Sequence, residues 1–257
     1  MIVTTGGRTD NITIDRAKKI ALSNECPYVE RKKKSISMLK KTYRQDIIIV
    51  GRSHISVNPL DQEAPMTFHP NMAMIRIRRL IKNELDPFIS ATTLKPGMRL
   101  LDCTMGLASD SIVASLQVGS DGHVTALEAD PLLHLMVSEG LKTYDTGIDE
   151  MNKAMQRITT ANIDHYGYLS QLPNDAFDVV YFDPMFDESI EASDGIQNIH
   201  SQTHQTELSI GVIREAKRVA KRRIVLKDHW KSPRFTQLGF TQLRRKSSLF
   251  HYGYIDV

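Results

Sequence analysis

The chain has 257 residues, of which 41% are hydrophobic and 25% charged, with a formal net charge of +3 and a pI near 8.8. This length and composition suit one large globular α/β domain, alone or with a smaller one, and exclude wholesale disorder. No apolar run approaches the roughly 18 residues of a membrane-spanning helix, and the start of the chain lacks the basic and apolar regions of a secretory signal.

The first 60 residues alternate between strand and helix patterns. Strands are predicted at 2–5, 46–51 and 53–57, and helices at 10–24 and 35–43. We therefore predict a small N-terminal α/β unit over residues 1–60. Residues 61–93 are predicted to form a linker rich in turn-forming residues, followed by a helix that starts at Asn71.

From residue 94 to 257, strand and helix patterns alternate regularly. Strands are predicted at 98–103, 122–127, 158–161, 177–182, 223–226 and 250–255, and helices at 110–118, 131–143, 148–157 and 210–220. Such alternation indicates a mostly parallel sheet that helices cover on both faces. Right-handed crossovers make it a doubly wound, Rossmann-like sheet, and the closing segments predict an antiparallel edge strand.

The loop after the first strand of this region is a candidate cofactor site, because ligands of such sheets bind beyond the carboxyl ends of the strands. It reads Asp-Cys-Thr-Met-Gly-Leu-Ala-Ser-Asp from 102 to 110, and only Gly106 matches the glycine pattern of dinucleotide enzymes. S-adenosylmethionine carries cationic groups and no phosphate, so acidic strand ends favour it over NAD. We predict contacts from Asp102, Thr104, Gly106 and Asp110. The alternative is a plain strand-to-helix turn in which Asp110 caps the helix.

Two further carboxylates follow strands of the same sheet. Glu128 ends the second strand, where a carboxylate can accept hydrogen bonds from both ribose hydroxyls. Asp164 follows the third strand and could accept a bond from the adenine amino group, although Asn162 is placed equally well.

The most informative motif is Asp183-Pro184-Met185-Phe186, which directly follows an apolar strand. The lone pair of an amino group on a base is delocalised into the ring, and acceptors aimed at its N–H groups localise it. The carboxylate of Asp183 and the carbonyl of Pro184 are suitable acceptors, and Phe186 offers a ring on which an extruded base can stack. We therefore predict methylation of an exocyclic amino group, with Asp183, Pro184 and Phe186 as catalytic residues.

Basic residues gather in four clusters, at 31–44, 76–82, 217–223 and 244–246. Beside a methyltransferase site, clustered positive charge favours a nucleic-acid partner over a small molecule. Lys227 and Trp230 follow another strand, where a contact to a phosphate or a base and a simple packing role are both open.

The two cysteines, Cys26 and Cys103, indicate reduced thiols and a cytoplasmic location. No histidine, cysteine and carboxylate set predicts a metal site, and we expect none.

The run Leu-Leu-Asp-Cys-Thr-Met-Gly-Leu-Ala-Ser-Asp at 100–110, together with Asp-Pro-Met-Phe at 183–186, resembles the RsmJ-like group of ribosomal RNA guanine-N2 methyltransferases. The chain is still more similar to a set of methyltransferases from Gram-positive bacteria, which share Phe-His-Pro-Asn-Met-Ala at 68–73 and Val-Thr-Thr-Gly at 3–6. The resemblance implies S-adenosylmethionine as methyl donor and ribosomal RNA as partner. It carries over Asp102, Gly106, Glu128 and Asp183 as site positions.

Two residues depart from the RsmJ-like pattern. Ala108 stands where these proteins usually have glycine, and Asp187 stands where they usually have a second proline. The longer, acidic loop that runs to Asp194 should border the acceptor pocket, so the target base stays open. The alternatives are an amino-methyltransferase of DNA, protein or a small molecule, and a non-catalytic RNA-binding module with this fold.

Overall fold

The structure is a computed structural model that describes residues 1–7, 9–184, 208–246 and 248–257. It divides into two compact units. Within the described residues, unit 1 comprises Met1–His69 and Leu135–Asp145, and unit 2 comprises Pro70–His134 together with 146–184 and 208–257. The domain boundaries predicted from the sequence, 1–60, 61–93 and 94–257, stay a prediction.

Unit 1 contains a four-stranded sheet with the order β1-β2-β3-β4. Strand β1 (Ile2–Thr5) is parallel to β2 (Ile47–Val50), whereas β3 (Ile55–Asn58) and β4 (Met66–Thr67) continue the sheet in antiparallel fashion. The side chain of Asp10 caps α1 (Asn11–Ser23), and that of Ser35 caps α2 (Ile36–Tyr43). The predicted strands and helices of this unit match the observed ones closely, but β4 lies in the segment predicted as linker.

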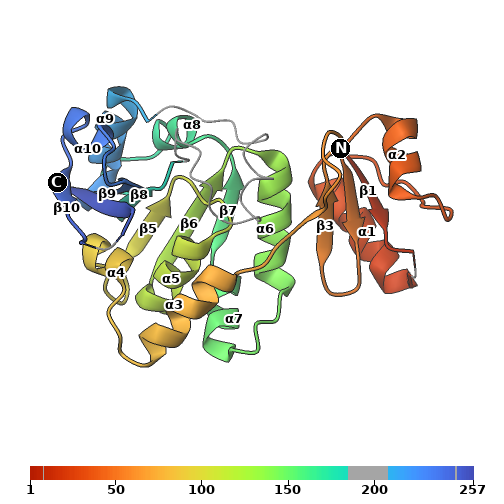
Figure 1. Ribbon diagram of the computed structural model, residues 1–257, viewed down its shortest axis with the longest axis horizontal. Coiled ribbons are helices and arrows are strands. Elements are labelled where there is room, and N and C mark those ends of the chain that lie inside the picture. Colours follow the sequence, from red (N-terminus) through yellow and green to blue (C-terminus); the bar gives the residue numbers. More distant parts are fainter. Residues whose placement is uncertain (8, 185–207, 247) are drawn as a thin grey trace. The chain divides into compact units, whose positions relative to one another are not determined.

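Unit 2 contains a seven-stranded sheet with the order β10-β11-β9-β8-β5-β6-β7 (Figure 1). Its parallel strands are β5 (Arg99–Asp102), β6 (His123–Glu128), β7 (Thr159–Asn162), β8 (Phe177–Phe182) and β9 (Ala220–His229). Strand β11 (Phe250–Asp256) is antiparallel to β9 and to the edge strand β10 (Thr241–Leu243). The predicted Rossmann-like sheet with an antiparallel edge is confirmed. Chain order reverses beside β5, so a ligand crevice is expected beyond β5 and β8.

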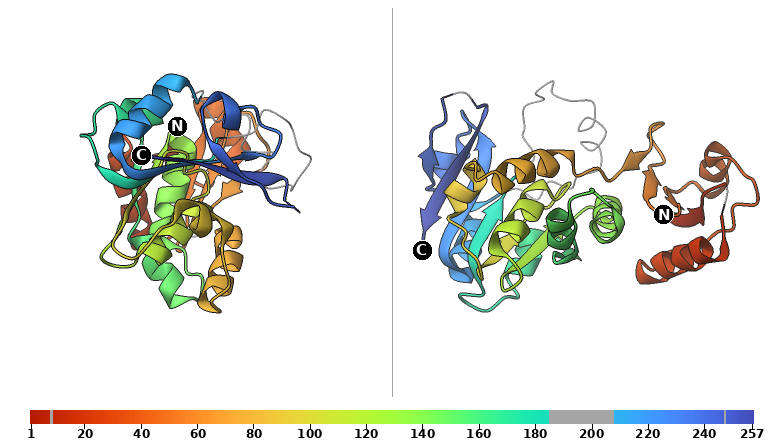
Figure 2. Two further views of the ribbon diagram at one scale, coloured as in Figure 1. Left: turned by 90° about the vertical axis from the view of Figure 1, so that its left-hand side faces the viewer. Right: turned by 90° about the horizontal axis from the view of Figure 1, so that it is seen from below.

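Helices cover both faces of this sheet (Figures 1 and 2). On one face lie α3 (Asn71–Ile81), α4 (Pro87–Thr92), α5 (Ser109–Val118) and α7 (Asp149–Gln156); on the other lie α8 (His165–Leu169) and α9 (Ile210–Val219). Helix α6 (Pro131–Thr143) follows β6, and α10 (Arg234–Gln237) precedes β10. Among the described residues, no helix is both long enough and apolar enough to cross a membrane.

Strand β8 shows which face of the sheet carries the predicted catalytic motif. Successive residues of a strand point to opposite faces. Val180 and Phe182 belong to the apolar core that α9 covers. Tyr181 points the other way, and its ring meets that of Phe88 in α4 edge-on, with the ring centres 4.8 Å apart. Asp183 therefore follows Tyr181 on the face that α3, α4 and α5 cover.

The elements that the sequence did not predict are short: β4, α4, α8, α10 and β10. In addition, β9 extends over Ala220–His229 rather than the predicted 223–226. Helix α4 nevertheless has a start signal in the sequence: Asp86 accepts hydrogen bonds from the backbone N–H groups of Phe88 and Ile89, and Pro87 occupies the first turn.

An ion pair joins α3 to the start of α4. Arg76 donates from Nε and Nη2 to the two carboxylate oxygens of Asp86, at 2.8 and 2.9 Å. Its Nη1 donates to Asp110 of α5 at 2.5 Å. The side chain of Arg76 is 17% exposed and both carboxylates are 7% exposed. One guanidinium thus binds two buried carboxylates, the N-cap of α4 and Asp110 of α5.

We predict that Arg76→Met lowers the free energy of unfolding by about 3 kcal/mol or more, because it leaves two buried carboxylates without this partner. The control is Arg79→Met, one turn further along α3, whose pair with Glu84 is 56% and 47% exposed. That change should cost about 1 kcal/mol or less. Urea unfolding measures both, and equal losses in the two variants would contradict this account of the pair.

Candidate active site

Asp102 ends β5 and is 1% exposed. Its Oδ2 accepts a hydrogen bond from the hydroxyl of Ser111 at 2.6 Å, and its Oδ1 accepts one from the backbone N–H of Thr104 at 3.0 Å. Burial raises the pKa of the Asp102 carboxyl to about 7, and the neighbouring carboxylates Asp110 and Asp183 add to the rise. Asp102 thereby fixes the start of the loop after β5 and the position of α5.

Gly106 lies at the turn of this loop with φ at +50°, a left-handed conformation that favours glycine. Its N–H donates to Oε2 of Glu128 at 3.1 Å, and Oε1 of the same carboxylate accepts from the N–H of Asp130 at 3.0 Å. A methyl group at Gly106 would meet only the carbonyl of Thr104, at 4.0 Å, so the turn leaves space beside it. The structure brings together two residues that the sequence assigned separately to cofactor binding.

Ala108, which replaces a glycine of the RsmJ-like pattern, is also left-handed, with φ at 60°. It is the N-cap of α5 and makes no side-chain capping bond. Asp110 lies inside the helix, so the alternative in which Asp110 caps it is wrong.

The last residue of β7, Asn162, and the nearby Asp164 both have partners within the protein. The side-chain amide of Asn162 donates to the carbonyls of Glu128 and Ala129, at 2.8 and 3.1 Å. Asp164 caps α8, with Oδ1 accepting from the N–H of Gly167 at 2.9 Å. Asn162 therefore holds the end of β6 close to β7, and a role of Asp164 toward an adenine stays a prediction.

Asp183, directly after β8, is tied to the loop after β5. Its backbone N–H donates to the hydroxyl of Thr104 at 2.6 Å. Its Oδ2 accepts from Nζ of Lys227 at 2.6 Å, and its side chain is 23% exposed. Burial raises the pKa of the Asp183 carboxyl, while the Lys227 ammonium opposes the rise. Pro184 follows in the described chain, whereas Phe186, Asp187 and the acidic loop to Asp194 lie outside the described residues.

Asp110 links this motif to the helices on the same face. It accepts hydrogen bonds from Tyr181 at 2.8 Å and from Lys227 at 3.3 Å, in addition to its bond from Arg76. The two cations hold the pKa of Asp110 well below its usual range, against the effect of burial. A contact of Asp110 with the cofactor stays a prediction.

Sequence reasoning did not place Arg76, Tyr181 and Lys227 in this site, and for Lys227 it left a phosphate contact and a packing role open. Arg76 was assigned to a phosphate-binding cluster, yet it is buried between carboxylates and only its neighbours Arg78, Arg79 and Lys82 are exposed. Lys227 pairs with acids at 110 and 183, which are 117 and 44 residues away in the chain. Trp230 is 45% exposed, and Nζ of Lys231 lies 5.1 Å from the centre of its ring.

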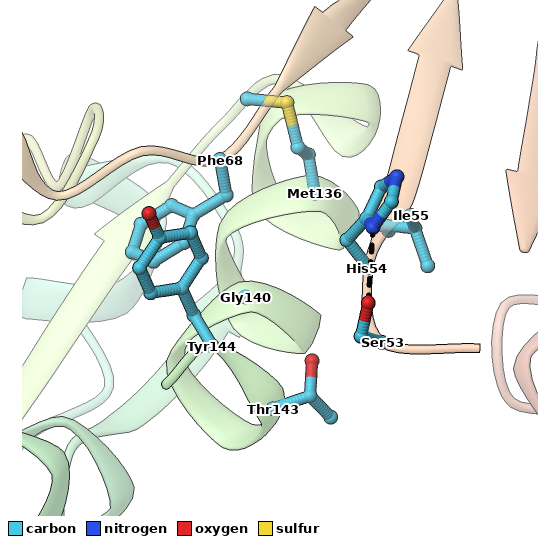
Figure 3. Close-up of a pocket in the computed structure, with 8 residues that line it drawn as sticks. All are labelled: Ser53, His54, Ile55, Phe68, Met136, Gly140, Thr143 and Tyr144. Carbon is cyan, nitrogen blue, oxygen red and sulfur yellow. Dashed lines mark hydrogen bonds between the residues drawn. The ribbon is translucent and has the colours of Figure 1, made fainter. Parts of the chain in front are cut away.

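A separate small pocket lies in unit 1 and is lined by Ser53, His54, Ile55, Phe68, Met136, Gly140, Thr143 and Tyr144 (Figure 3). The rings of Phe68 and Tyr144 meet edge-on, with their centres 5.8 Å apart. A methyl group at Gly140 would lie 2.3 Å from the Phe68 ring, so glycine allows this ring to pack on α6. None of the predicted site residues lines this pocket.

No metal site is found in the described part of the chain, where no three histidine, cysteine, aspartate or glutamate residues are grouped closely enough. His200 and His204, which are four residues apart in the sequence, lie outside the described residues.

Comparison with curated proteins identifies relatives along the whole chain and along part of it. YpiP of Bacillus subtilis (strain 168) is 43% identical over 256 residues, which cover 100% of this chain and 99% of YpiP. Ribosomal RNA small subunit methyltransferase J of Psychrobacter arcticus is 31% identical over 114 residues, covering 42% of this chain and 36% of that protein. The same enzyme of Marinobacter nauticus is 28% identical over 141 residues, covering 53% and 49%. The chain thus matches between about a third and a half of the length of these RNA methyltransferases.

A solved structure and a family model agree with these matches. The SAM-dependent methyltransferase NGO1261 of Neisseria gonorrhoeae has a similar fold, with a TM-score of 0.63, 15% identity, and coverage of 100% of this chain and 96% of that one. The family model described as "Putative SAM-dependent methyltransferase" matches residues 31–248, which is most of the chain. The chain therefore belongs to this family of SAM-dependent methyltransferases, enzymes whose cofactor is S-adenosylmethionine.

Proposed function

We propose that this enzyme methylates an exocyclic amino group of an RNA base, and that the base is guanine in ribosomal RNA, methylated at N2. The observation that carries the proposal is the hydrogen bond between the backbone of Asp183 and the hydroxyl of Thr104. This bond holds the predicted amine-binding motif against the predicted cofactor loop. The partial similarity to ribosomal RNA small subunit methyltransferase J supports ribosomal RNA as the substrate.

S-adenosylmethionine supplies a methyl group on a cationic sulfur. We assign its binding to the loop of Asp102, Thr104 and Gly106, with Glu128 for the ribose, Asp164 for the adenine and Asp110 as a supporting acid. The space beside Gly106 and the carboxylates at the ends of β5 and β6 suit a cationic nucleoside. Because both oxygens of Asp102 already accept internal bonds, we expect it to act by shaping the loop.

We assign binding of the substrate's exocyclic amino group to Asp183 and Pro184. The carboxylate of Asp183 and the carbonyl of Pro184 accept bonds from its N–H groups, so that its lone pair is directed toward the methyl group. Asp183 also stabilises the positive charge that develops on the nitrogen as the carbon–sulfur bond breaks. The extra proton then passes from the methylated nitrogen to water, and S-adenosylhomocysteine is the second product. Phe186 is proposed to stack on the base. The free thiols of Cys26 and Cys103 support the proposal of a cytoplasmic location, where ribosomal RNA is available.

Substitution of the acceptor carboxylate tests the assigned reaction. We expect Asp183→Asn and Asp183→Ala to lower methyl transfer by roughly 100-fold or more, because the amine loses its charged acceptor. The substrate is ribosomal RNA from a strain that lacks the enzyme, in which mass spectrometry should find one methyl group missing. Asp121→Asn, in an exposed turn, is the control. Full activity of the Asp183 variants, or an unchanged methylation pattern in the deletion strain, would contradict the proposal.

Calorimetry tests the binding site separately from the reaction. The enzyme should bind S-adenosylmethionine and not NAD, and Glu128→Gln should weaken that binding by about tenfold or more, since a charged acceptor is lost. Glu128 also holds the N–H groups of Gly106 and Asp130, so thermal melting must show that the variant is folded. If a folded Glu128→Gln variant binds S-adenosylmethionine as tightly as the wild type, Glu128 does not contribute to cofactor binding.

The N-terminal basic cluster is proposed to contact RNA phosphates. Arg31 and Lys40 donate to backbone carbonyls of their own unit, whereas Lys32, Lys33 and Lys41 are exposed. Replacing these three lysines by glutamine should reduce the salt dependence of RNA binding by about two units of slope, since each phosphate contact to a single strand contributes about 0.7. The control is the Lys18→Gln/Lys19→Gln pair on α1, which is also exposed. If the salt dependence of RNA binding is the same in the triple variant and the wild type, these lysines do not contact RNA phosphates.

A further inference from the structure

Lys227 stands beside Asp183 because of the register of the sheet. Phe182 of β8 pairs with Leu226 of β9, so the next residues along, Asp183 and Lys227, are neighbours. Lys227 in turn pairs with Tyr252 of β11. Side chains at paired positions of adjacent strands lie on the same face. Three polar side chains therefore form a row across the carboxyl end of the sheet.

The contacts of Lys227 are specific. Its Nζ donates to Oδ2 of Asp183 at 2.6 Å and to Oδ2 of Asp110 at 3.3 Å, and its side chain is 23% exposed. Among the described residues, no hydrogen bond reaches Oδ1 of Asp183. One oxygen of the carboxylate is thus held by the protein, and the other is left to accept a bond.

Asp110 fixes the cation in this position. Arg76 and Tyr181 hold Asp110 from α3 and β8, at 2.5 and 2.8 Å. Asp110 is 7% exposed, so its charge is poorly screened by solvent and acts strongly on Lys227. A lysine in contact with an anchored carboxylate stays charged and has a defined place.

We propose that Lys227 is a positioning residue, which holds one oxygen of Asp183 and keeps this carboxylate ionised so that its other oxygen can accept the amine of the substrate. This role rests on the proposed function of Asp183. Lys227 does not touch the reacting atoms. Lys227 keeps the carboxylate of Asp183 able to accept a hydrogen bond and orients its second oxygen toward the substrate amine.

Several other groups interact with Asp183, and together with Lys227 they determine how its pKa is shifted. They are Asp110 of α5, Asp102 of β5, Tyr181 of β8, Tyr252 of β11 and Asp228 of β9, with Arg76 of α3 behind Asp110. Burial is the main cause that raises the pKa of Asp183, and Asp110 and Asp228 act in the same direction. Lys227 lowers it by charge and by hydrogen bonding. Removal of Lys227 must therefore raise the pKa of Asp183 further.

The decisive measurement is the titration of Asp183 by carbon NMR, with carboxyl-labelled aspartate and with Asp183→Asn to assign the signal. We expect Lys227→Met to raise the titration midpoint by about one unit or more, the size of effect that an opposite charge at this distance exerts. Lys227→Arg, which keeps the charge, should stay near the wild type. Lys221→Met removes an exposed lysine of the same strand and should have no effect. An unchanged midpoint in Lys227→Met would overturn the proposal.

Kinetics then connect the titration to the reaction. Methyl transfer by Lys227→Met should fall most at low pH, where its Asp183 is protonated, and the deficit relative to the wild type should become smaller as the pH rises. A lysine with a purely structural role would lower the rate by the same factor at every pH, and that result would contradict the proposal. If the wild type transfers no methyl group to RNA, the proposed function fails, yet the NMR titration still decides the role of Lys227.

A second measurement covers the case in which Lys227→Met does not fold. In the wild type, the Cε signal of Lys227 should shift as Asp183 titrates, and Asp183→Asn should abolish that shift. A Cε signal that does not respond to the titration of Asp183 would overturn the proposal without any change at Lys227.

Discussion

A chain of alternating charges connects the helices of unit 2 to the end of its central strands. It runs from Asp86 through Arg76, Asp110 and Lys227 to Asp183, with each contact between 2.5 and 3.3 Å. A charge buried alone is strongly unfavourable, so every member of this chain requires its neighbour. This row of paired charges therefore constrains where α3, α4 and α5 can lie relative to β8 and β9. It also fixes the position of the Asp183 carboxylate, on which the proposed chemistry depends.

The loops at the carboxyl edge of the sheet are joined to one another in a second way. Glu128 binds the N–H of Gly106, and Thr104 binds the N–H of Asp183, so the ends of β5, β6 and β8 are linked by direct hydrogen bonds. These hydrogen bonds hold the residues proposed to bind the methyl donor close to the residues proposed to bind the acceptor amine. Methyl transfer depends on such positioning, because the nitrogen must approach the methyl carbon at short range and in line with the carbon–sulfur bond.

The sequence predicted the parts of the fold that local patterns encode. The strands β5, β6 and β8 are apolar runs that end at a carboxylate, and both the strands and the acids that follow them are visible in the sequence. Short elements such as α8 and β10 have too few residues for a periodic pattern to emerge. Lys227 and Arg76 could not be assigned, because their partners lie far away in the chain and only the strand order brings them together. Without the structure, a buried arginine and an exposed one look the same.

Above all, we propose that the methyl donor lies between the loop of Gly106, with Glu128, and the carboxylate of Asp183. A crystal structure with S-adenosylhomocysteine, the demethylated product of the donor, tests it most directly. We expect the ribose at Glu128 and the sulfur facing Asp183. Nucleoside density elsewhere in the molecule, or a crevice closed by side chains in crystals that contain the ligand, would contradict it.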